Sequence, residues 1–293
     1  MSTSRIDHAV VITGASSGIG KACALQLDQL GFRVFAGVRK EQDADALSAA
    51  ASERLTPVFL DVTDGAAIAS AAETVTQTVT GHGLAGLVNN AGVSVGGPLE
   101  SVPVAELRRL LEINVVGQIA VTQAFLPLLR TGKGRVVNMS SISGRVALPF
   151  FGPYAASKHA LEALSHSLRR ELRPWRIHVA IIEPGNVATP IWEKSIAHSK
   201  EMFDNMPAEA KRLYGQTIAG VENAVEKAIQ NAIPAERVAR AVARALTAKR
   251  PKARYLVGAD ARFLALFSEL LPVRLADLIV ARMTGSPRRG EGP

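Results

Sequence analysis

Tyr154 and Lys158, in the stretch "YAASK", are the side chains whose types and spacing most directly suggest chemistry. On a helix this spacing places both on one face, so the ammonium can favour the ionised form of the phenol. An unperturbed tyrosine, with a pKa of about 10, is a poor base at neutral pH without such a cation. Ser141, at the end of "NMSS", would hydrogen-bond a substrate oxygen. The alternative is an ordinary surface pair, which this spacing alone does not exclude.

The composition is that of a globular chain with few special features. It has 293 residues, 47% of them hydrophobic, which is enough to bury a sizeable core. The single cysteine, Cys23, excludes a disulfide framework within the chain and a cysteine-based metal site. His159 and His166 lack a third ligand, so no metal is expected.

Charge and hydropathy also limit the partners and the location. The net charge of +8 comes from scattered Lys and Arg without an aromatic-rich basic strip, so no nucleic-acid partner is expected. The apolar run near the N-terminus is far shorter than a signal peptide or a membrane span, which predicts a cytoplasmic protein.

Short apolar runs alternate with amphipathic stretches of helical length. This pattern predicts an α/β fold of the Rossmann type, a doubly wound parallel sheet with helices on both faces, in a single domain over residues 1–293. The expected strands are residues 8–13, 33–38, 57–62, 86–92, 135–140, 178–185 and 253–258.

Two segments interrupt the alternation. Residues 190–233 are polar to mixed and helical in pattern, which predicts an excursion over the carboxyl edge of the sheet, where substrate binds; a plain surface insertion is the alternative. Residues 262–283 are amphipathic, but Pro272 and several charges exclude a membrane span. This C-terminal segment would pack on its own domain, cover a partner subunit, or make peripheral contact with a membrane.

The stretch "TGASSGIG" joins the first expected strand to a helix. Glycines at this junction let the backbone approach a pyrophosphate that lies on the helix N-terminus. The alternative is an ordinary glycine-rich turn. The candidate cofactor-binding residues here are Thr13, Gly14, Ser16, Ser17, Gly18, Ile19 and Gly20.

The ends of the next strands suggest which dinucleotide binds. The second strand ends in Arg39 and Lys40 instead of a carboxylate, which favours the 2′-phosphate of NADP(H) over the free ribose of NAD(H). Arg39 in a solvated loop is the alternative. Asp61, which is equally consistent with a helix N-cap, is a candidate for the adenine end together with Val62. In "NNAG", small residues let the cofactor lie close to the backbone, which adds Asn90, Ala91 and Gly92.

Taken together, "TGASSGIG", "NNAG", "EINVVG", "NMSS", "YAASK" and "PGNVAT" resemble the short-chain dehydrogenase/reductase family, in its compact single-domain branch. The resemblance covers residues 8–190 and resumes at the last expected strand. It implies an NAD(P)-dependent oxidoreductase in which Tyr154 is the general acid/base and Ser141 orients the reacting oxygen. It also implies that Lys158 lowers the pKa of the phenol and binds the nicotinamide ribose, and that Asn114 holds a water in a proton relay. The residues it implies at the nicotinamide are Pro184, Gly185, Val187 and Thr189.

Apolar and aromatic residues surround the expected site and suggest the substrate. Leu148, Phe150, Phe151 and Trp192, without a cationic anchor, favour a hydrophobic alcohol, ketone or aldehyde. The stretch that includes "YAASK" is similar to the branch of retinol and 17β-hydroxysteroid dehydrogenases, which implies a steroid, retinoid or lipid-like carbonyl compound. The resemblance also implies a homodimer or homotetramer. The alternative functions are an NADPH-binding protein without turnover and a lipid-surface binding protein.

Overall fold

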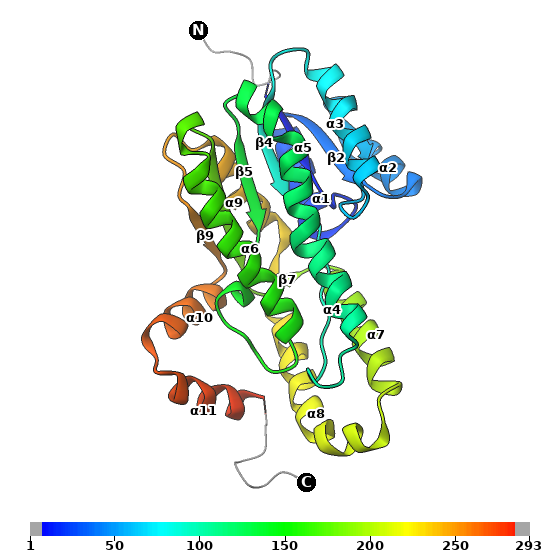
Figure 1. Cartoon of the computed structure of the whole chain (residues 1–293), viewed down its shortest axis with the longest axis vertical. Helices are drawn as coiled ribbons and strands as arrows, with labels where there is room; N and C mark the ends of the chain where they lie inside the picture. The colour runs from blue at the N-terminus through cyan, green and yellow to red at the C-terminus, as the bar shows by residue number, and fades with distance from the viewer. Residues whose placement is uncertain (1–7, 285–293) are drawn as a thin grey trace.

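The computed structural model describes residues 8–284, so the ends of the expected 1–293 domain, residues 1–7 and 285–293, lie outside the described part (Figure 1). One seven-stranded sheet runs through this part, and every pair of neighbouring strands is parallel. The strand order is β3-β2-β1-β4-β5-β6-β9. The strands are β1 (Ala9–Ile12), β2 (Arg33–Val38), β3 (Leu55–Phe59), β4 (Leu84–Asn89), β5 (Arg135–Met139), β6 (His178–Pro184) and β9 (Arg254–Val257).

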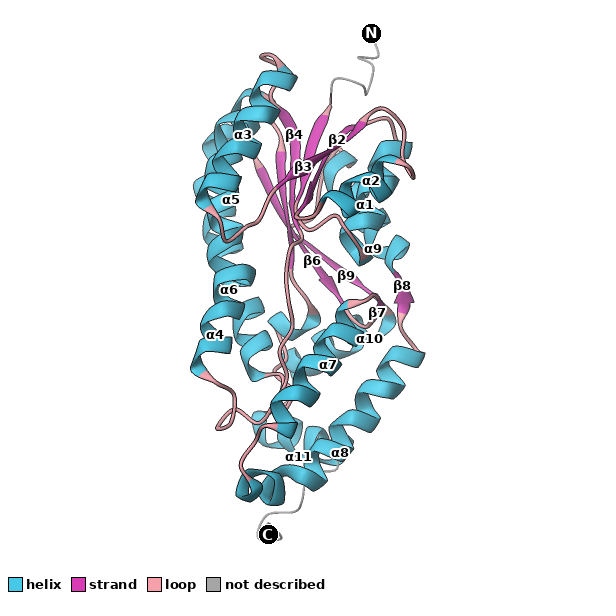
Figure 2. Cartoon of the chain, turned by 90° about the vertical axis from the view of Figure 1, so that its right-hand side faces the viewer, coloured by secondary structure: helices cyan, strands magenta, loops and turns pink. Residues whose placement is uncertain are grey.

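Helices cover both faces of this sheet, which confirms the predicted doubly wound α/β fold (Figure 2). One layer contains α1 (Gly18–Gln29), α2 (Glu41–Ser48) and α9 (Ala235–Thr247). The other contains α3 (Gly65–Val79), α4 (Val104–Leu111), α5 (Gly117–Thr131) and α6 (Gly152–Glu171). From β1 the strand order runs through β2 to β3 on one side, whereas β4 and the later strands lie on the other side of β1. The strand order therefore reverses between β1 and β4. These two strands form a topological switch point, where such sheets bind ligands.

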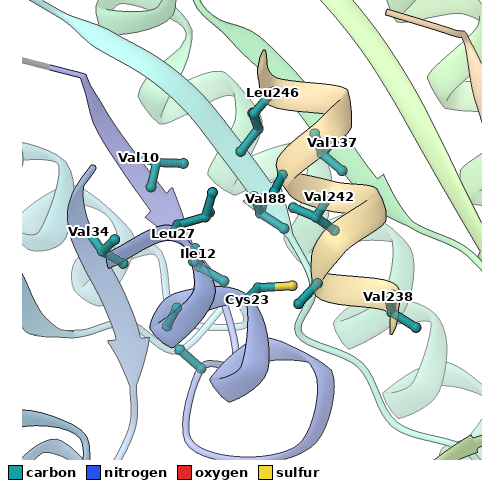
Figure 3. Packing of buried hydrophobic residues seen from close by; sticks show 14 of the residues in the cluster. Val10, Ile12, Cys23, Leu27, Val34, Val88, Val137, Val238, Val242 and Leu246 are labelled. Carbon is teal, nitrogen blue, oxygen red and sulfur yellow. The ribbon is translucent and has the colours of Figure 1, made fainter. Parts of the chain in front are cut away.

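Alternating side chains of the strands build two separate cores. In β1, Val10 and Ile12 belong to the core under α1 and α9, whereas Val11 belongs to the core under α3 and α5. Figure 3 shows the first core, in which Leu27 and Val242 meet the sheet. Each fully buried side chain of this size contributes about 1.5–3 kcal/mol through removal of apolar surface from water.

Residues Val104–Thr131 form one helical run, in which the π-helical turn η2 (Glu112–Val116) joins α4 to α5. The run is long and apolar enough by length and composition to cross a membrane. Leu110, Phe125 and Leu129 are fully buried, whereas Val104 and Val116 are exposed. Burial in the core therefore accounts for part of the hydropathy of this run.

The expected edge strand differs from the observed one. The sequence predicts residues 57–62, but β3 covers Leu55–Phe59 and leaves Asp61 beyond its end. Pro57 lies inside the strand, which is possible because β3 is at the edge of the sheet, where one side of the backbone needs no donor.

Residues 190–233 lie beyond the carboxyl end of the sheet, as Figure 2 shows. They form α7 (Ile191–Asp204) and α8 (Ala208–Gln230), and the short parallel pair β7 (Val187–Ala188) and β8 (Ile233–Pro234) closes the base of this excursion. The pair fixes where the chain leaves the sheet and where it returns.

The C-terminal segment forms two helices. α10 (Ala259–Leu270) and α11 (Val273–Met283) are separated at Pro272, which cannot continue a helix from the preceding turn. Ala261 and Ala265 of α10 pack with Ile142 in a small apolar cluster. A cavity of about 500 Å³ lies between these two helices and residues 145–149.

Candidate active site

The glycine-rich loop after β1 is joined to the end of β4. Thr13 Oγ1 accepts hydrogen bonds from the backbone N–H groups of Asn90 and Ala91, both at 2.9 Å. Asn90 Nδ2 donates in return to the carbonyls of Thr13 and Gly14, at 3.0 and 3.1 Å. Gly14 has φ +64° and lies so close that an added Cβ would be 2.8 Å from Ala91 Cα. Only glycine satisfies both conditions.

The start of α1 is open to an anion. Ser17 occupies the N-cap position without a side-chain cap bond, and no acidic residue occurs in the first turn. The first N–H groups of the helix are therefore available to a phosphate group. Gly18, with φ +54°, faces Thr189, because an added Cβ would lie 3.2 Å from the Thr189 side chain. Ser16 and Ile19 belong to the same turn, and Gly20 packs directly on the Gly14 carbonyl.

Arg39 at the end of β2 faces Asp61 at the end of β3, with 3.6 Å between Nη1 and Oδ2. Burial alone would raise the pKa of Asp61, but hydrogen bonds from Thr63 and the Arg39 charge lower it. The N-cap of α3 is Asp64, so the N-cap alternative for Asp61 is wrong. Lys40 is exposed beside Arg39. Val62 is buried against Gly117.

Tyr154, Ser141 and Lys158 come together at the carboxyl end of β5. Burial raises the pKa of Tyr154, and a side-chain hydrogen bond with Ser141 opposes this. Ser141 Oγ is itself oriented by the Ser143 N–H at 3.1 Å. Lys158 Nζ donates to the Met139 carbonyl at 2.8 Å and lies 5.6 Å from the centre of the Tyr154 ring. The hydroxyls and the ammonium therefore form one connected group.

Lys158 is only 4% exposed, which changes its acidity. Burial lowers the pKa of Lys158 to about 8, although the negative charge of Glu162 opposes the shift. The amine can therefore gain or lose a proton close to neutral pH.

Asn114 lies in the π-helical turn, fully buried. Its Nδ2 group donates to the Val93 carbonyl at 2.8 Å and to Ser157 Oγ at 3.0 Å, while its Oδ1 accepts from the Val93 N–H at 2.9 Å. Ser157 Oγ continues this chain to the Tyr154 carbonyl at 2.7 Å. The Asn114 side chain thus ties the loop after β4 to the helix of Tyr154, and π turns often mark functional sites.

The loop expected at the nicotinamide follows β6. Pro184 ends the strand, Val187 starts β7, and a Cβ on Gly185 would overlap the carboxylate of Asp260. Asp260 Oδ2 also accepts the Asn186 N–H at 2.7 Å. Asp260 was not predicted from the sequence, because it is distant in the chain and carries no motif of its own.

The candidate substrate residues do not share one cavity. Leu148 lines the cavity under α10 and α11, which includes neither Phe151 nor Trp192. Trp192 donates from Nε1 to the Val187 carbonyl at 3.0 Å. Phe150, with φ +66°, packs edge-on against Tyr214 of α8, with 6.0 Å between ring centres. Phe150 therefore connects the loop before α6 to the α7–α8 excursion, and Leu148 faces the C-terminal helices.

A group of buried carboxylates and partly buried arginines lies near Lys158 and was not predicted from the sequence. Arg254 Nη2 is 2.9 Å from Glu162 Oε2 and 2.7 Å from His166 Nε2, and Arg254 Nη1 bonds to Glu183. Arg145 Nε is 3.0 Å from Glu183 Oε2. The only sequence signal was a glutamate inside an otherwise apolar strand, "HVAIIEP", because the partners come from four separate elements.

This geometry defines a class of protein: a dinucleotide-dependent oxidoreductase with its site at the switch point of a parallel sheet. The family model described as "short chain dehydrogenase" matches residues 8–200, and the chain belongs to that family.

Curated relatives extend over nearly the whole chain. The 17-beta-hydroxysteroid dehydrogenase type 6 of Bos taurus is 40% identical, across 96% of this chain and 90% of the relative. Retinol dehydrogenase 16 of Homo sapiens is 40% identical, across 97% and 90%. The NADPH-dependent 3-dehydrocapnine reductase of Ornithobacterium rhinotracheale is 38% identical, across 92% and 94%.

Solved structures agree in fold. A short-chain dehydrogenase from Streptomyces avermitilis has a TM-score of 0.76 at 30% identity, covering 99% of this chain and 100% of its own. One from Burkholderia cenocepacia, in complex with NADP, has a TM-score of 0.70 at 28% identity, covering 95% and 98%. One from Burkholderia phymatum, in complex with NAD, has a TM-score of 0.75 at 24% identity, covering 93% and 94%.

Proposed function

We propose that this oxidoreductase uses NADP(H) to interconvert a hydrophobic alcohol with its ketone or aldehyde, with Tyr154 as the acid/base. The observation that carries the proposal is the connected group at the end of β5. There a half-buried phenol is hydrogen-bonded to Ser141, and Lys158 is directed toward the same ring. Such a group can hold a proton at the oxygen of a bound substrate.

The bound dinucleotide would supply or accept the hydride at the reacting carbon. In reduction, the Tyr154 hydroxyl gives its proton to the carbonyl oxygen, and in oxidation the phenolate takes the alcohol proton. Ser141 holds that oxygen by a hydrogen bond, and the Lys158 ammonium stabilises the phenolate. Both reactions balance with one hydride and one proton.

The residues present fit a dinucleotide. The Gly14 backbone lies against Ala91 with no room for a side chain, and the uncapped start of α1 offers N–H groups to a pyrophosphate. Arg39 and Lys40 would hold the 2′-phosphate, since the Arg39 side chain is 68% exposed despite its contact with Asp61. Relatives support this cofactor, because one is named NADPH-dependent and one neighbour was solved with NADP.

Arg39→Ala tests the cofactor preference. Loss of a charged hydrogen-bond partner of the 2′-phosphate should weaken NADPH binding by roughly 10–100-fold and leave NADH binding nearly unchanged. The measurement is a fluorescence titration of both cofactors. Arg33→Ala, at the opposite end of β2, is the matched control. Equal weakening of NADPH and NADH would show that Arg39 does not bind the phosphate.

The substrate class follows from the apolar surroundings of the site and from the relatives. Three aromatic side chains in this region are half-buried: Phe150 and Phe151 in the loop before α6, and Trp192 in α7. Phe150 packs on Tyr214 of the excursion. Two of the relatives are named for a hydroxysteroid and for retinol, which supports a steroid, retinoid or lipid-like substrate.

Nicotinamide absorbance tests this substrate class directly. The panel contains ketosteroids, retinal, long-chain aldehydes and ketones, with a sugar and a keto acid as polar controls. We expect NADPH consumption with the hydrophobic compounds only. Turnover confined to the polar controls would contradict the substrate class, and absence of any turnover would favour the alternative of an NADPH-binding protein without catalysis.

We further propose that the chain is a cytoplasmic homo-oligomer. We also propose that its C-terminal face, which is made of the exposed side chains of α10 and α11, contacts lipid. Large apolar side chains stand exposed on this face, and Arg262, Arg274 and Arg282 are exposed on the same helices, which suits an anionic bilayer surface. The exposed apolar residues of this face are Phe263, Leu266, Leu270, Val273, Leu275 and Leu278. Subunit pairing through the helical run Val104–Thr131 and through α6 is supported by the exposed Val116 and Leu164.

A further inference from the structure

Glu162 lies one helical turn beyond Lys158 on α6 and takes no part in the chemistry proposed above. It is 5% exposed, which is costly for a carboxylate unless other groups balance its charge. Its surroundings come from several elements of the fold: Ser140 after β5, Arg145 after η3 (Ile142–Gly144), Glu183 of β6, Arg254 of β9 and His166 of α6.

The charges in this group are arranged in a shared network. Arg254 contacts Glu162 at 2.9 Å and also bonds to Glu183, which Arg145 contacts at 3.0 Å. Among the described residues, this network thus contains two guanidinium groups and two carboxylates. The Lys158 ammonium is an additional buried positive charge. Glu162 is the carboxylate that shares a face of α6 with Lys158, because the two residues are four positions apart.

Glu162 also supports the turn that carries Ser141. Ser140, the residue immediately before Ser141, acts on the carboxyl group of Glu162 by lowering its pKa. The turn packs so closely that a Cβ on Gly144 would lie 2.7 Å from Ser140 Oγ and 3.0 Å from Glu162 Cγ. The same side chain thus contacts the turn bearing Ser141 and lies one turn below Lys158.

We propose that Glu162 is a positioning residue, which keeps Lys158 charged beside Tyr154 and fixes the turn that presents Ser141. The inference rests on the proposed function, since it assigns a role within that reaction. It concerns the network behind the site, and not the residues that touch the substrate.

The acidities of the two groups agree with this role. Burial raises the pKa of Glu162 to about 7, Ser140 and Arg254 oppose the rise, and Glu183 adds to it. Burial lowers the pKa of Lys158 to about 8, which Glu162 opposes. His166 has its pKa lowered by burial and by Arg254, so it adds no positive charge at neutral pH. Glu162 is therefore ionised where Lys158 begins to lose its proton, and there its charge keeps the amine protonated.

Glu162→Gln tests the role through the pH profile of ketone reduction. The amide keeps the shape and removes the charge, so the pKa of Lys158 should fall further, and the alkaline limb of the profile should move down by roughly one pH unit. Below the pKa of Glu162 the wild-type carboxyl is already protonated, so there the variant should match the wild type within a few-fold. Glu171→Gln, an exposed glutamate on the same helix, should leave the profile unchanged.

A purely structural role would give a different result, namely equal loss of kcat at all pH values or an unchanged alkaline limb with a lower melting temperature. Either result would overturn the proposal. If Glu162→Gln does not fold, Ser140→Ala serves instead: Ser140 lowers the pKa of Glu162, so its loss should raise that pKa, and the limb should shift in the same direction by a smaller amount. An unshifted limb in Ser140→Ala would likewise overturn it.

Tyr154→Phe, measured alongside, distinguishes a failure of the proposed function from a failure of the proposed role of Glu162. If Tyr154→Phe keeps its turnover, the proposed function itself fails. If Tyr154→Phe is inactive and the Glu162→Gln profile is unshifted, only the role of Glu162 fails.

Discussion

At the scale of single residues, burial changes the chemistry of the site. Lys158 is a strong cation in water, yet in the fold its pKa is about 8. Tyr154 has its pKa raised by burial, so the phenol needs its neighbours to ionise. A side-chain hydrogen bond with Ser141 acts against that burial. The acidity of the phenol thus depends on its neighbours as well as on its own burial.

Gly14→Ala is expected to weaken cofactor binding. The residue has φ +64°, and a Cβ would lie 2.8 Å from the Ala91 backbone, so the loop must shift away from β4. Titration with NADPH should show at least a tenfold weaker affinity. Gly65→Ala is the matched control, because no atom lies within 4 Å of its added Cβ. An unchanged affinity in Gly14→Ala would show that the loop does not hold the dinucleotide.

At the scale of elements, the sheet depends on helices that pack on both of its faces. α5 illustrates this, because Phe125 is fully buried between α3 and the sheet. Apolar side chains on one helix face, and not the intrinsic preference of the sequence for helix, thus stabilise the element.

Phe125→Ala should lower the free energy of unfolding by about 3–5 kcal/mol, because it leaves a large cavity in the core. Phe59→Ala removes the same side chain where it is 58% exposed, and should change stability little. Chemical denaturation of both variants checks this. Similar losses in the two variants would mean that this core is not packed as described.

The sequence predicted those elements whose signal is local. The alternation of apolar and polar residues indicated β1 and β6, and the glycine spacing indicated the cofactor loop. The π turn around Asn114 and the break at Pro272 are small departures that a helical pattern does not resolve. The cluster of Glu162, Glu183 and Arg254 was unpredictable for another reason: α6, β6 and β9 are brought together only by folding.

At the scale of the whole molecule, the fold gathers its proposed functional parts at the carboxyl end of the sheet. The glycine loop, the connected group around Tyr154 and the α7–α8 excursion all lie there (Figures 1 and 2). The C-terminal helices close a cavity against residues 145–149 and leave an apolar face uncovered. An uncovered face of this kind suggests a surface partner.

Phe263→Ser and Leu270→Ser, combined, should reduce binding to anionic liposomes severalfold, because both side chains are more than 60% exposed on α10. Flotation of the full chain measures this, and Phe59→Ser is the control for an exposed apolar residue elsewhere. If wild type does not float, the lipid contact is wrong. Light scattering that showed the double variant to be monomeric beside an oligomeric wild type would identify the face as a subunit interface instead.

The most direct test of the central claim is the turnover of Tyr154→Phe with NADPH and the best carbonyl substrate of the panel. The variant should bind NADPH as tightly as wild type and lose roughly 10²–10⁴-fold in kcat, because only the proton donor is removed. The control is Tyr255→Phe on the edge strand β9, which removes a hydroxyl that accepts a hydrogen bond from the Lys252 N–H. This variant should keep the wild-type rate. Turnover of Tyr154→Phe at the wild-type rate would contradict the account.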